Sequence, residues 1–284
     1  MPRHNKLRLS YCAEQVRRQD HDRFLTVLFA PQNRREALFA LYAFNQELAR
    51  IRETVSEPML GEIRLQWWYE ALRDIYAGQI RHHEVVQALA QAIRDHDLPR
   101  EAFEQLIEAR RQDLYDETLA DLDSLRDYLR KTPGTLAALA ARILQDSDSR
   151  LQARAVEMGE LWGLVGIMRA VPYHLSLNKL LLPETMMKKY GLTKTGLANA
   201  QNQDNLQRLI AELCGTAEDQ LAALRRHRKT IPARAHSLFL LASLSQSYLK
   251  SLRKAGHNPF ALAERADALP RQFRLIRDGL FRRF

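Results

Sequence analysis

Two short segments of the chain carry glutamate, arginine, tyrosine and histidine residues that could take part in metal binding or proton transfer. Residues 40–53 read Ala-Leu-Tyr-Ala-Phe-Asn-Gln-Glu-Leu-Ala-Arg-Ile-Arg-Glu, and residues 163–174 read Gly-Leu-Val-Gly-Ile-Met-Arg-Ala-Val-Pro-Tyr-His. Carboxylates four residues apart on a helix project from one face, and two such helices facing each other can share Mg²⁺ ions with a diphosphate. The first segment offers Glu47 and Glu53, whose six-residue spacing places them on different faces, and the second segment offers no carboxylate. We therefore expect no magnesium cluster of this type.

Four basic residues lie in or beside the same segments: Arg50, Arg52, Arg169 and Lys179. They could bind an anion without a metal, because the arginine fork matches phosphate geometry. The alternative, which we favour, is that they pair with neighbouring acids, namely Glu47, Glu53 and Glu160.

The pairs Tyr173-His174 and Trp67-Trp68 are further candidates for chemistry. The first could transfer protons, since histidine titrates near neutral pH, but a hydrogen-bonded feature at a helix end is the interpretation we favour. The second could line an apolar tunnel, although aromatic residues at helical spacing more often belong to a core.

Two polar clusters are weaker candidates for metal sites. Asp113, Asp116 and Glu117 form an acidic group that we interpret as a solvated helix end. His82 and His83 lack the spacing of a helical zinc site and are expected in a surface loop.

Helical periodicity dominates the chain, and no segment shows the alternation typical of a strand. We expect helices within residues 35–53, 65–78, 84–96, 100–118, 121–144, 150–170, 204–229 and 235–254. No composition shift divides the sequence, so the prediction is an all-α protein with a single domain over residues 1–284.

Composition limits the possible partners and compartments. The chain has 284 residues, a net charge of +9 and two cysteines, and it contains no apolar run of membrane-spanning or signal-peptide length. The charge predicts an acidic partner, but no helix-turn-helix or stacking-aromatic pattern indicates nucleic acid. The cysteines are expected to be reduced, without a disulfide or zinc site.

The last segment, residues 271–284, is predicted to form a basic amphipathic helix. Its apolar residues Phe273, Ile276, Leu280, Phe281 and Phe284 share one face, flanked by five arginines. We favour packing of this stripe on the bundle, and contact with an anionic membrane is the second interpretation. The candidates for that contact are Phe273, Arg274, Arg277, Phe281 and Arg282.

Short motifs in a fixed order extend over nearly the whole chain: residues 24–31, 34–38, 41–44, 64–68, 75–78, 107–116, 128, 134–135 and 182–183. In order and spacing they resemble the squalene/phytoene synthase family. That resemblance implies an isoprenoid-synthase-type helical bundle around a central cavity, which in active relatives holds two isoprenoid diphosphates. It also suggests Tyr42, Phe44 and Tyr173 as residues lining the cavity.

The resemblance also assigns the positions of the family's two Asp-x-x-x-Asp pairs. The first pair falls at Ala49 and Glu53, with Arg50 between them, and the second falls at Ala170 and His174. One carboxylate therefore remains of the four, and a resident cofactor is not expected. The family's Mg²⁺ would apply only to an active enzyme.

One branch of the family shares these substitutions. Residues 43–49, 56–57 and 169–174 resemble the complex I assembly factors of prenyl-synthase type and their bacterial relatives. This implies a non-catalytic protein that works with subunits or assembly intermediates of respiratory complex I, with an isoprenoid lipid as a further candidate ligand. The implied location is the cytoplasmic face of a bacterial inner membrane, or the mitochondrial matrix side.

Two alternatives remain open at this stage. The first is a prenyltransferase that joins two isoprenoid diphosphates with relocated ligands, for which the candidates are Glu47, Glu53, Asp113 and Glu160. The second is a lipid- or quinone-binding module that uses a surviving apolar tunnel. Fold alone does not decide among these functions.

Overall fold

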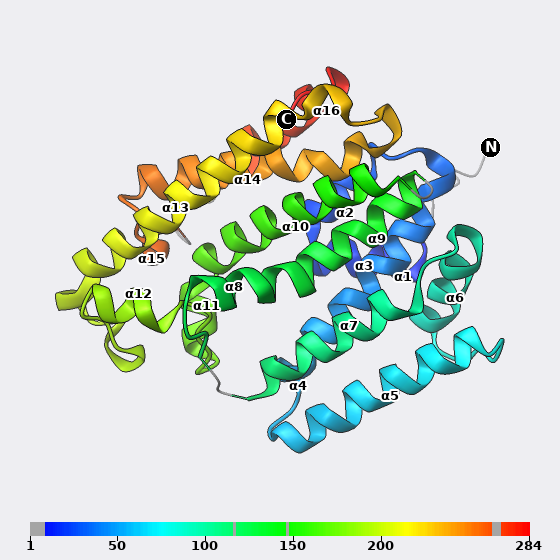
Figure 1. Ribbon diagram of the computed structural model, residues 1–284, viewed down its shortest axis with the longest axis horizontal. Helices are drawn as coiled ribbons and strands as arrows, with labels where there is room; N and C mark the ends of the chain where they lie inside the picture. Colours follow the sequence, from blue (N-terminus) through cyan, green and yellow to red (C-terminus); the bar gives the residue numbers. More distant parts are fainter. Residues whose placement is uncertain (1–8, 116–117, 146–147, 263–267) are drawn as a thin grey trace, which may run out of the picture.

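The computed structural model describes residues 9–115, 118–145, 148–262 and 268–284. Within these ranges the chain is helical and contains no strand, which confirms the predicted all-α class. Figure 1 shows the helices arranged as a bundle in which the long elements run roughly side by side. No helix in these ranges is both long and apolar enough to cross a membrane.

The first half of the chain forms the helices α1 (Tyr11–Gln19), α2 (His21–Val27), α3 (Arg35–Ala49), α4 (Ile51–Thr54), α5 (Pro58–Tyr76), α6 (Glu84–His96), α7 (Arg100–Arg111), α8 (Leu122–Leu129) and α9 (Thr135–Leu144). Short 3₁₀ turns, η1 (Gln32–Arg34) and η2 (Gln112–Leu114), and a π-helical turn, η3 (Arg130–Gly134), connect some of them.

The second half forms α10 (Ser149–Arg169), α11 (Val171–Ser176), α12 (Glu184–Lys189), α13 (Gln203–Arg226), α14 (His236–Lys254), α15 (Pro259–Leu262) and α16 (Ala268–Leu280). The 3₁₀ turns here are η4 (Lys194–Gly196), η5 (Ala200–Asn202), η6 (Arg228–Thr230) and η7 (Ala233–Ala235).

Helices α3, α10 and α14 supply much of the core. Every residue of α3 from Leu38 to Asn45 is buried, and so is every residue of α14 from His236 to Ser245. A helix that is buried all round belongs at the centre of a bundle. Helix α10 packs against α9, α13 and α14, so the second candidate segment is held by the core.

The helix predicted over residues 35–53 breaks at Arg50. This residue ends α3 and precedes α4, with φ −88° and ψ −5°. The break contains neither proline nor glycine, so the periodicity of the sequence gave no sign of it. After the break, Glu53 on α4 lies near Tyr173 of α11.

The π-helical turn η3 lies directly against α10. Pro133 cannot donate a backbone hydrogen bond, and its presence displaces the helical ladder locally. A Cβ atom added to Gly159 of α10 would lie 2.2 Å from the Pro133 carbonyl oxygen, so only glycine permits this approach.

Helix α16 packs through a different face from the predicted one. Leu275, Asp278 and Phe284 are buried, and the Phe284 ring stacks on Phe239 at a centroid distance of 5.5 Å. The expectation that the predicted stripe packs on the bundle is correct for Phe284 and wrong for its other four residues. Those four side chains are 49–70% exposed: Phe273, Ile276, Leu280 and Phe281.

The docking of α16 explains this orientation. Gly279 lies so close to Phe29 that an added Cβ would be 2.4 Å from its ring, and the His236 ring nitrogen is 3.2 Å from the Asp278 carbonyl oxygen. These contacts fix the face that points inward. The four-residue stripe, called here the α16 apolar face, therefore points outward.

Cys12 and Cys214 are free thiols in the interior of the bundle. Burial is the main cause that raises the pKa of each thiol to about 12. The expectation of reduced cysteines is consistent with these positions, which are unsuited to thiolate chemistry.

We expect Gly159→Ala to lower the free energy of unfolding by about 3 kcal/mol, because its new methyl group would meet backbone atoms of η3. The matched control is Gly166→Ala on the same helix, where an added Cβ meets nothing within 4 Å. The control should gain up to about 1 kcal/mol from helix propensity. Urea unfolding of both variants checks this; equal effects would contradict the close packing.

Candidate functional site

The two candidate segments meet where Glu53 of α4 lies beside Tyr173 of α11. Burial, together with the neighbouring Glu53 carboxylate, raises the pKa of the Tyr173 hydroxyl to about 12, and Arg50 Nε lies 3.8 Å from Glu53 Oε2. Tyr173 is itself half-exposed. The one carboxylate that remains at the four motif positions is therefore engaged by an arginine and a tyrosine.

A buried ion cluster lies beside this junction. Asp113 Oδ1 is 2.7 Å from Lys179 Nζ and accepts a 2.9 Å hydrogen bond from the Tyr128 hydroxyl, and Arg110 Nη1 is 3.0 Å from Asp113 Oδ2. The side chain of Asp113 is only 6% exposed. The cluster therefore joins η2, α7 and α8 to the segment that follows α11.

The expectation that Asp113 belongs to a solvated face is wrong. The turn η2 directs this side chain inward, where two cations and a tyrosine meet it, and such partners cannot be read from the local sequence. Asp116 and Glu117, the other members of the predicted acidic cluster, lie outside the described residues.

The electrostatics of the cluster favour the paired charges. Burial opposes ionisation of Asp113, but Lys179 and Arg110 outweigh it and lower the pKa of this carboxyl. Burial lowers the pKa of Lys179, although Asp113 opposes that effect. Burial and then Lys179 lower the pKa of His174 to about 4, so this imidazole is neutral near pH 7.

These residues do not fit the family's magnesium cluster. Ala49 and Ala170 offer methyl groups where carboxylates would be needed, and Asp113 is already bound by two cations. Mg²⁺ requires several free oxygen ligands in near-octahedral geometry. In the described part of the chain, no three His, Cys, Asp or Glu side chains gather in a group that could hold a metal.

The four candidate anion-binding residues are distributed among different partners. Arg50 pairs with Glu53, Lys179 pairs with Asp113, and the Arg169 guanidinium lies 3.2 Å from the centroid of the Tyr248 ring. Arg52 is close enough to Lys179 to contribute to the lowering of its pKa. Arg52 and Lys179 are thus brought near each other, whereas Arg169 is held on α14.

The predicted pairing of the basic residues with Glu47, Glu53 and Glu160 is correct for Glu53, which pairs with Arg50. It is wrong for Glu47 and Glu160. Glu47 accepts a 2.6 Å hydrogen bond from Gln15, and Glu160 lies 2.9 Å from Arg130 Nε. Arg110 and Tyr128 were not identified as site residues from the sequence. The sequence marked them only as parts of the family motifs at residues 107–116 and at residue 128.

Two of the three candidate cavity-lining residues lie in the core. Phe44 is fully buried, with its ring edge-on to Trp68 and Phe103. Tyr42 lies under the Arg23 guanidinium, 5.4 Å from it, and burial raises its pKa to about 12. Tyr173 is the exception, at the exposed junction described above.

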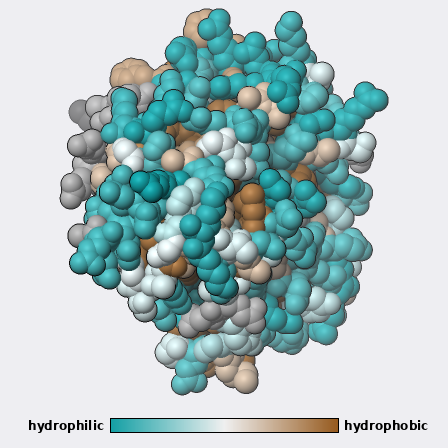
Figure 2. All heavy atoms as spheres, turned by 60° about the vertical axis from the view of Figure 1, so that its left-hand side comes forward, coloured by the Kyte–Doolittle hydropathy of each residue, from teal (hydrophilic) through white to brown (hydrophobic). Residues whose placement is uncertain are grey.

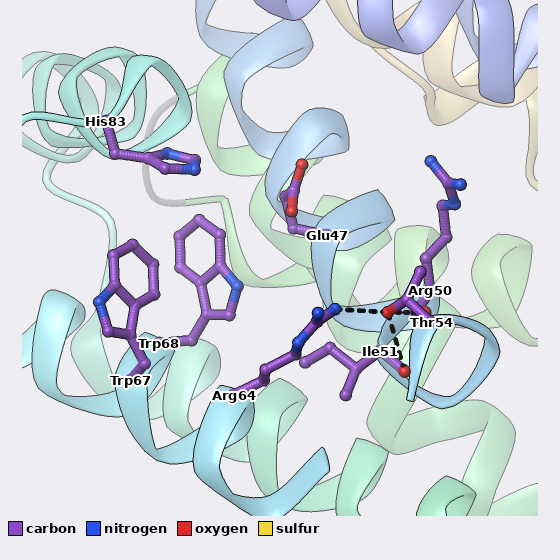
Figure 3. Close-up of a pocket in the computed structure, with 8 residues that line it drawn as sticks. All are labelled: Glu47, Arg50, Ile51, Thr54, Arg64, Trp67, Trp68 and His83. Carbon is purple, nitrogen blue, oxygen red and sulfur yellow. Dashed lines mark hydrogen bonds between the residues drawn. The ribbon is translucent and has the colours of Figure 1, made fainter. Parts of the chain in front are cut away.

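A pocket of about 340 Å³ lies between α3–α4 and α5 (Figure 3). Trp67, Trp68 and His83 form one wall, and Glu47 faces it from α3. Arg64, on the same helix as the tryptophans, reaches Thr54 of α4. Trp68 is buried, as predicted for a core residue. His83 lies in the loop before α6, as expected, and its ring is tilted to the Trp67 indole and edge-on to the Trp68 indole.

The bundle and the paired broken helices, α3–α4 and α10–α11, define a protein of the isoprenoid-synthase type. The solved structure of squalene synthase HpnC from Alicyclobacillus acidocaldarius matches 87% of this chain and 94% of its own, with a TM-score of 0.77 and 24% identity. A dehydrosqualene synthase structure matches 96% of this chain and 95% of its own, with a TM-score of 0.84 and 18% identity. Both likenesses confirm the predicted fold.

The family model for squalene/phytoene synthases matches residues 16–274, so the chain belongs to the squalene/phytoene synthase family. It is also similar to human NADH dehydrogenase (ubiquinone) complex I, assembly factor 6, with 29% identity over 262 residues. That alignment covers 92% of this chain and 79% of the human protein. The recognised family and branch are confirmed.

We expect Lys179→Met to lower the free energy of unfolding by about 3 kcal/mol, because it leaves a buried carboxylate with one cation fewer. The matched control is Lys188→Met, which removes the exposed pair with Glu184 and should cost less than about 0.5 kcal/mol. Urea unfolding compares them. A loss of less than about 1 kcal/mol for Lys179→Met would show that the pair contributes little.

His174 should make stability depend on pH. Because its folded pKa of about 4 is below its ordinary value of 6.5, the unfolded chain binds more protons in that window. Wild-type stability therefore falls by up to about 3 kcal/mol as the pH drops from 6.5 to 4. In His174→Gln this slope should largely disappear; an unchanged slope by urea unfolding would refute the assignment.

Proposed function

We propose that this protein is a non-catalytic member of its family that assists assembly of respiratory complex I. The observation that carries the proposal is its similarity to the human complex I assembly factor over 92% of the chain. A match of that extent includes both candidate segments, where the motif carboxylates of the enzymes are replaced.

The geometry of the site supports a role without prenyl transfer. Stabilising a departing diphosphate requires concentrated positive charge, which the enzymes of this fold obtain from metal ions held by carboxylates. Here Glu53 is engaged by Arg50 and Tyr173, and Asp113 is bound by Lys179 and Arg110. The carboxylates that a metal ion would need are already paired with basic side chains of the protein.

A membrane surface is the proposed place of action. The α16 apolar face is exposed, and Arg274, Arg277 and Arg282 lie on or just after the same helix. An amphipathic helix of this kind can insert its apolar side chains at the interface of an anionic bilayer while the arginines contact phosphate. The partners in this proposal are complex I subunits or assembly intermediates.

Gene deletion with complementation tests the proposal. Deletion should lower assembled complex I and its NADH:ubiquinone oxidoreductase activity, while squalene and carotenoid levels stay unchanged. A gene carrying Glu53→Gln should restore complex I fully, because no catalytic carboxylate is needed.

Purified wild-type protein with Mg²⁺ and farnesyl diphosphate or geranylgeranyl diphosphate provides the opposing measurement. Condensation of two prenyl diphosphates that Glu53→Gln abolishes would establish the prenyltransferase alternative. Normal complex I in the deletion strain would separately remove the assembly role.

A further inference from the structure

A basic groove separates α13 from α14 on the side of the bundle that carries α16. It has a volume of about 500 Å³ and is lined by Glu218, Leu221, Ala222, Arg225, Gln246, Leu249, Lys250 and Arg253. Glu218 is paired with Arg253, so this carboxylate does not neutralise the other lining cations. The groove therefore has positive charge over an apolar floor.

Two arginines from different helices converge on one neutral acceptor at the edge of this groove. Arg225 Nη2 of α13 donates a 2.9 Å hydrogen bond to Gln246 Oε1, and Arg274 Nη2 of α16 donates to the same oxygen. Like charges held this close repel each other. Burial first, and Arg274 second, lower the pKa of Arg225, and the nearby Asp278 opposes this shift only in part.

Hydrogen-bonding capacity is also unused there. The Nε atoms of Arg225 and Arg274 are buried and have no hydrogen-bond partner within the described residues. Arg274 Nε lies 3.6 Å from Asp278 Oδ2, an ion pair too long for a hydrogen bond, and Arg277 donates two hydrogen bonds to Oδ1 of the same carboxylate. Buried donors without acceptors are costly, and a multivalent oxyanion would satisfy them.

The position of the groove indicates the source of such an anion. Helix α16 packs beside α14 (Figure 1), and its Arg274 contributes to the converging pair. The α16 apolar face is on the same helix and is exposed. A helix that inserts this face into a bilayer would bring the groove to the level of lipid headgroups.

We propose that the α13–α14 groove, with Arg225 and Arg274, binds the phosphate group of an anionic phospholipid. The shared chemistry is a phosphate that accepts hydrogen bonds from two arginine forks. The inference that the phosphate belongs to a lipid depends on the membrane location proposed above. The inference that the groove binds a phosphate depends only on the two convergent arginines and their unpaired Nε–H groups.

Vesicle binding tests the proposal with the full chain, using phosphatidylcholine vesicles with and without phosphatidylglycerol. Arg225→Gln should weaken binding to phosphatidylglycerol vesicles about thirtyfold, through a lost charged hydrogen bond and a lost charge. The matched control is Arg226→Gln, an exposed arginine one residue further along α13. It should lose at most about fivefold, the effect of one surface charge.

Thermal unfolding with inorganic phosphate separates a soluble ligand from a lipid. Phosphate should raise the melting temperature of the wild type and of Arg226→Gln, but not that of Arg225→Gln. Without phosphate, Arg225→Gln should melt no lower than the wild type because the repulsion with Arg274 is gone, which excludes misfolding as the cause.

Each outcome decides one part of the proposal. Equal vesicle binding and equal phosphate response of the two variants would overturn the site. A phosphate response that depends on Arg225, without a matching vesicle effect, would overturn the lipid source. The variant Phe273→Ser/Phe281→Ser should lose vesicle binding while keeping its phosphate response; unchanged vesicle binding would remove α16 insertion and leave the groove standing.

Discussion

The buried carboxylate of Asp113 constrains the architecture of the whole candidate site. A single ionised group with 6% of its side chain exposed is tolerable only if cations and donors surround it. Lys179, Arg110 and Tyr128 meet that requirement, and each comes from a different segment of the chain. Because all three side chains contact this one carboxylate, the end of α7, helix α8 and the segment after α11 are held together.

This arrangement changes the electrostatic character of a familiar scaffold without disturbing its shape. The bundle keeps the paired broken helices of the isoprenoid-synthase fold, and its likeness to squalene and dehydrosqualene synthase structures extends over most of the chain. At the junction, Glu53 pairs with Arg50, and the buried Asp113 pairs with Lys179 and Arg110. The acids there are therefore neutralised by the protein's own side chains.

Much of the fold was predictable because periodicity reports which face of a helix is buried. Helix α6 was expected over residues 84–96 and is found there, because Val85, Leu89 and Ile93 follow the helical repeat. The site was less predictable, since the break at Arg50 has no helix-breaking residue and the burial of Asp113 depends on partners distant in sequence. The orientation of α16 was mispredicted for a related reason: the contacts of Gly279 with Phe29 and of Asp278 with His236, both distant in sequence, leave Phe273, Leu280 and Phe281 pointing outward.

The two buried cysteines have a practical consequence for studying the protein. With both thiols inside the bundle and their pKa values near 12, reagents that attack thiolates would leave Cys12 and Cys214 largely untouched in the folded state. A cysteine engineered onto an outward-facing position could then be labelled selectively without removing the native thiols. A spin label or fluorophore attached in this way would measure the depth of individual helices at an interface, residue by residue.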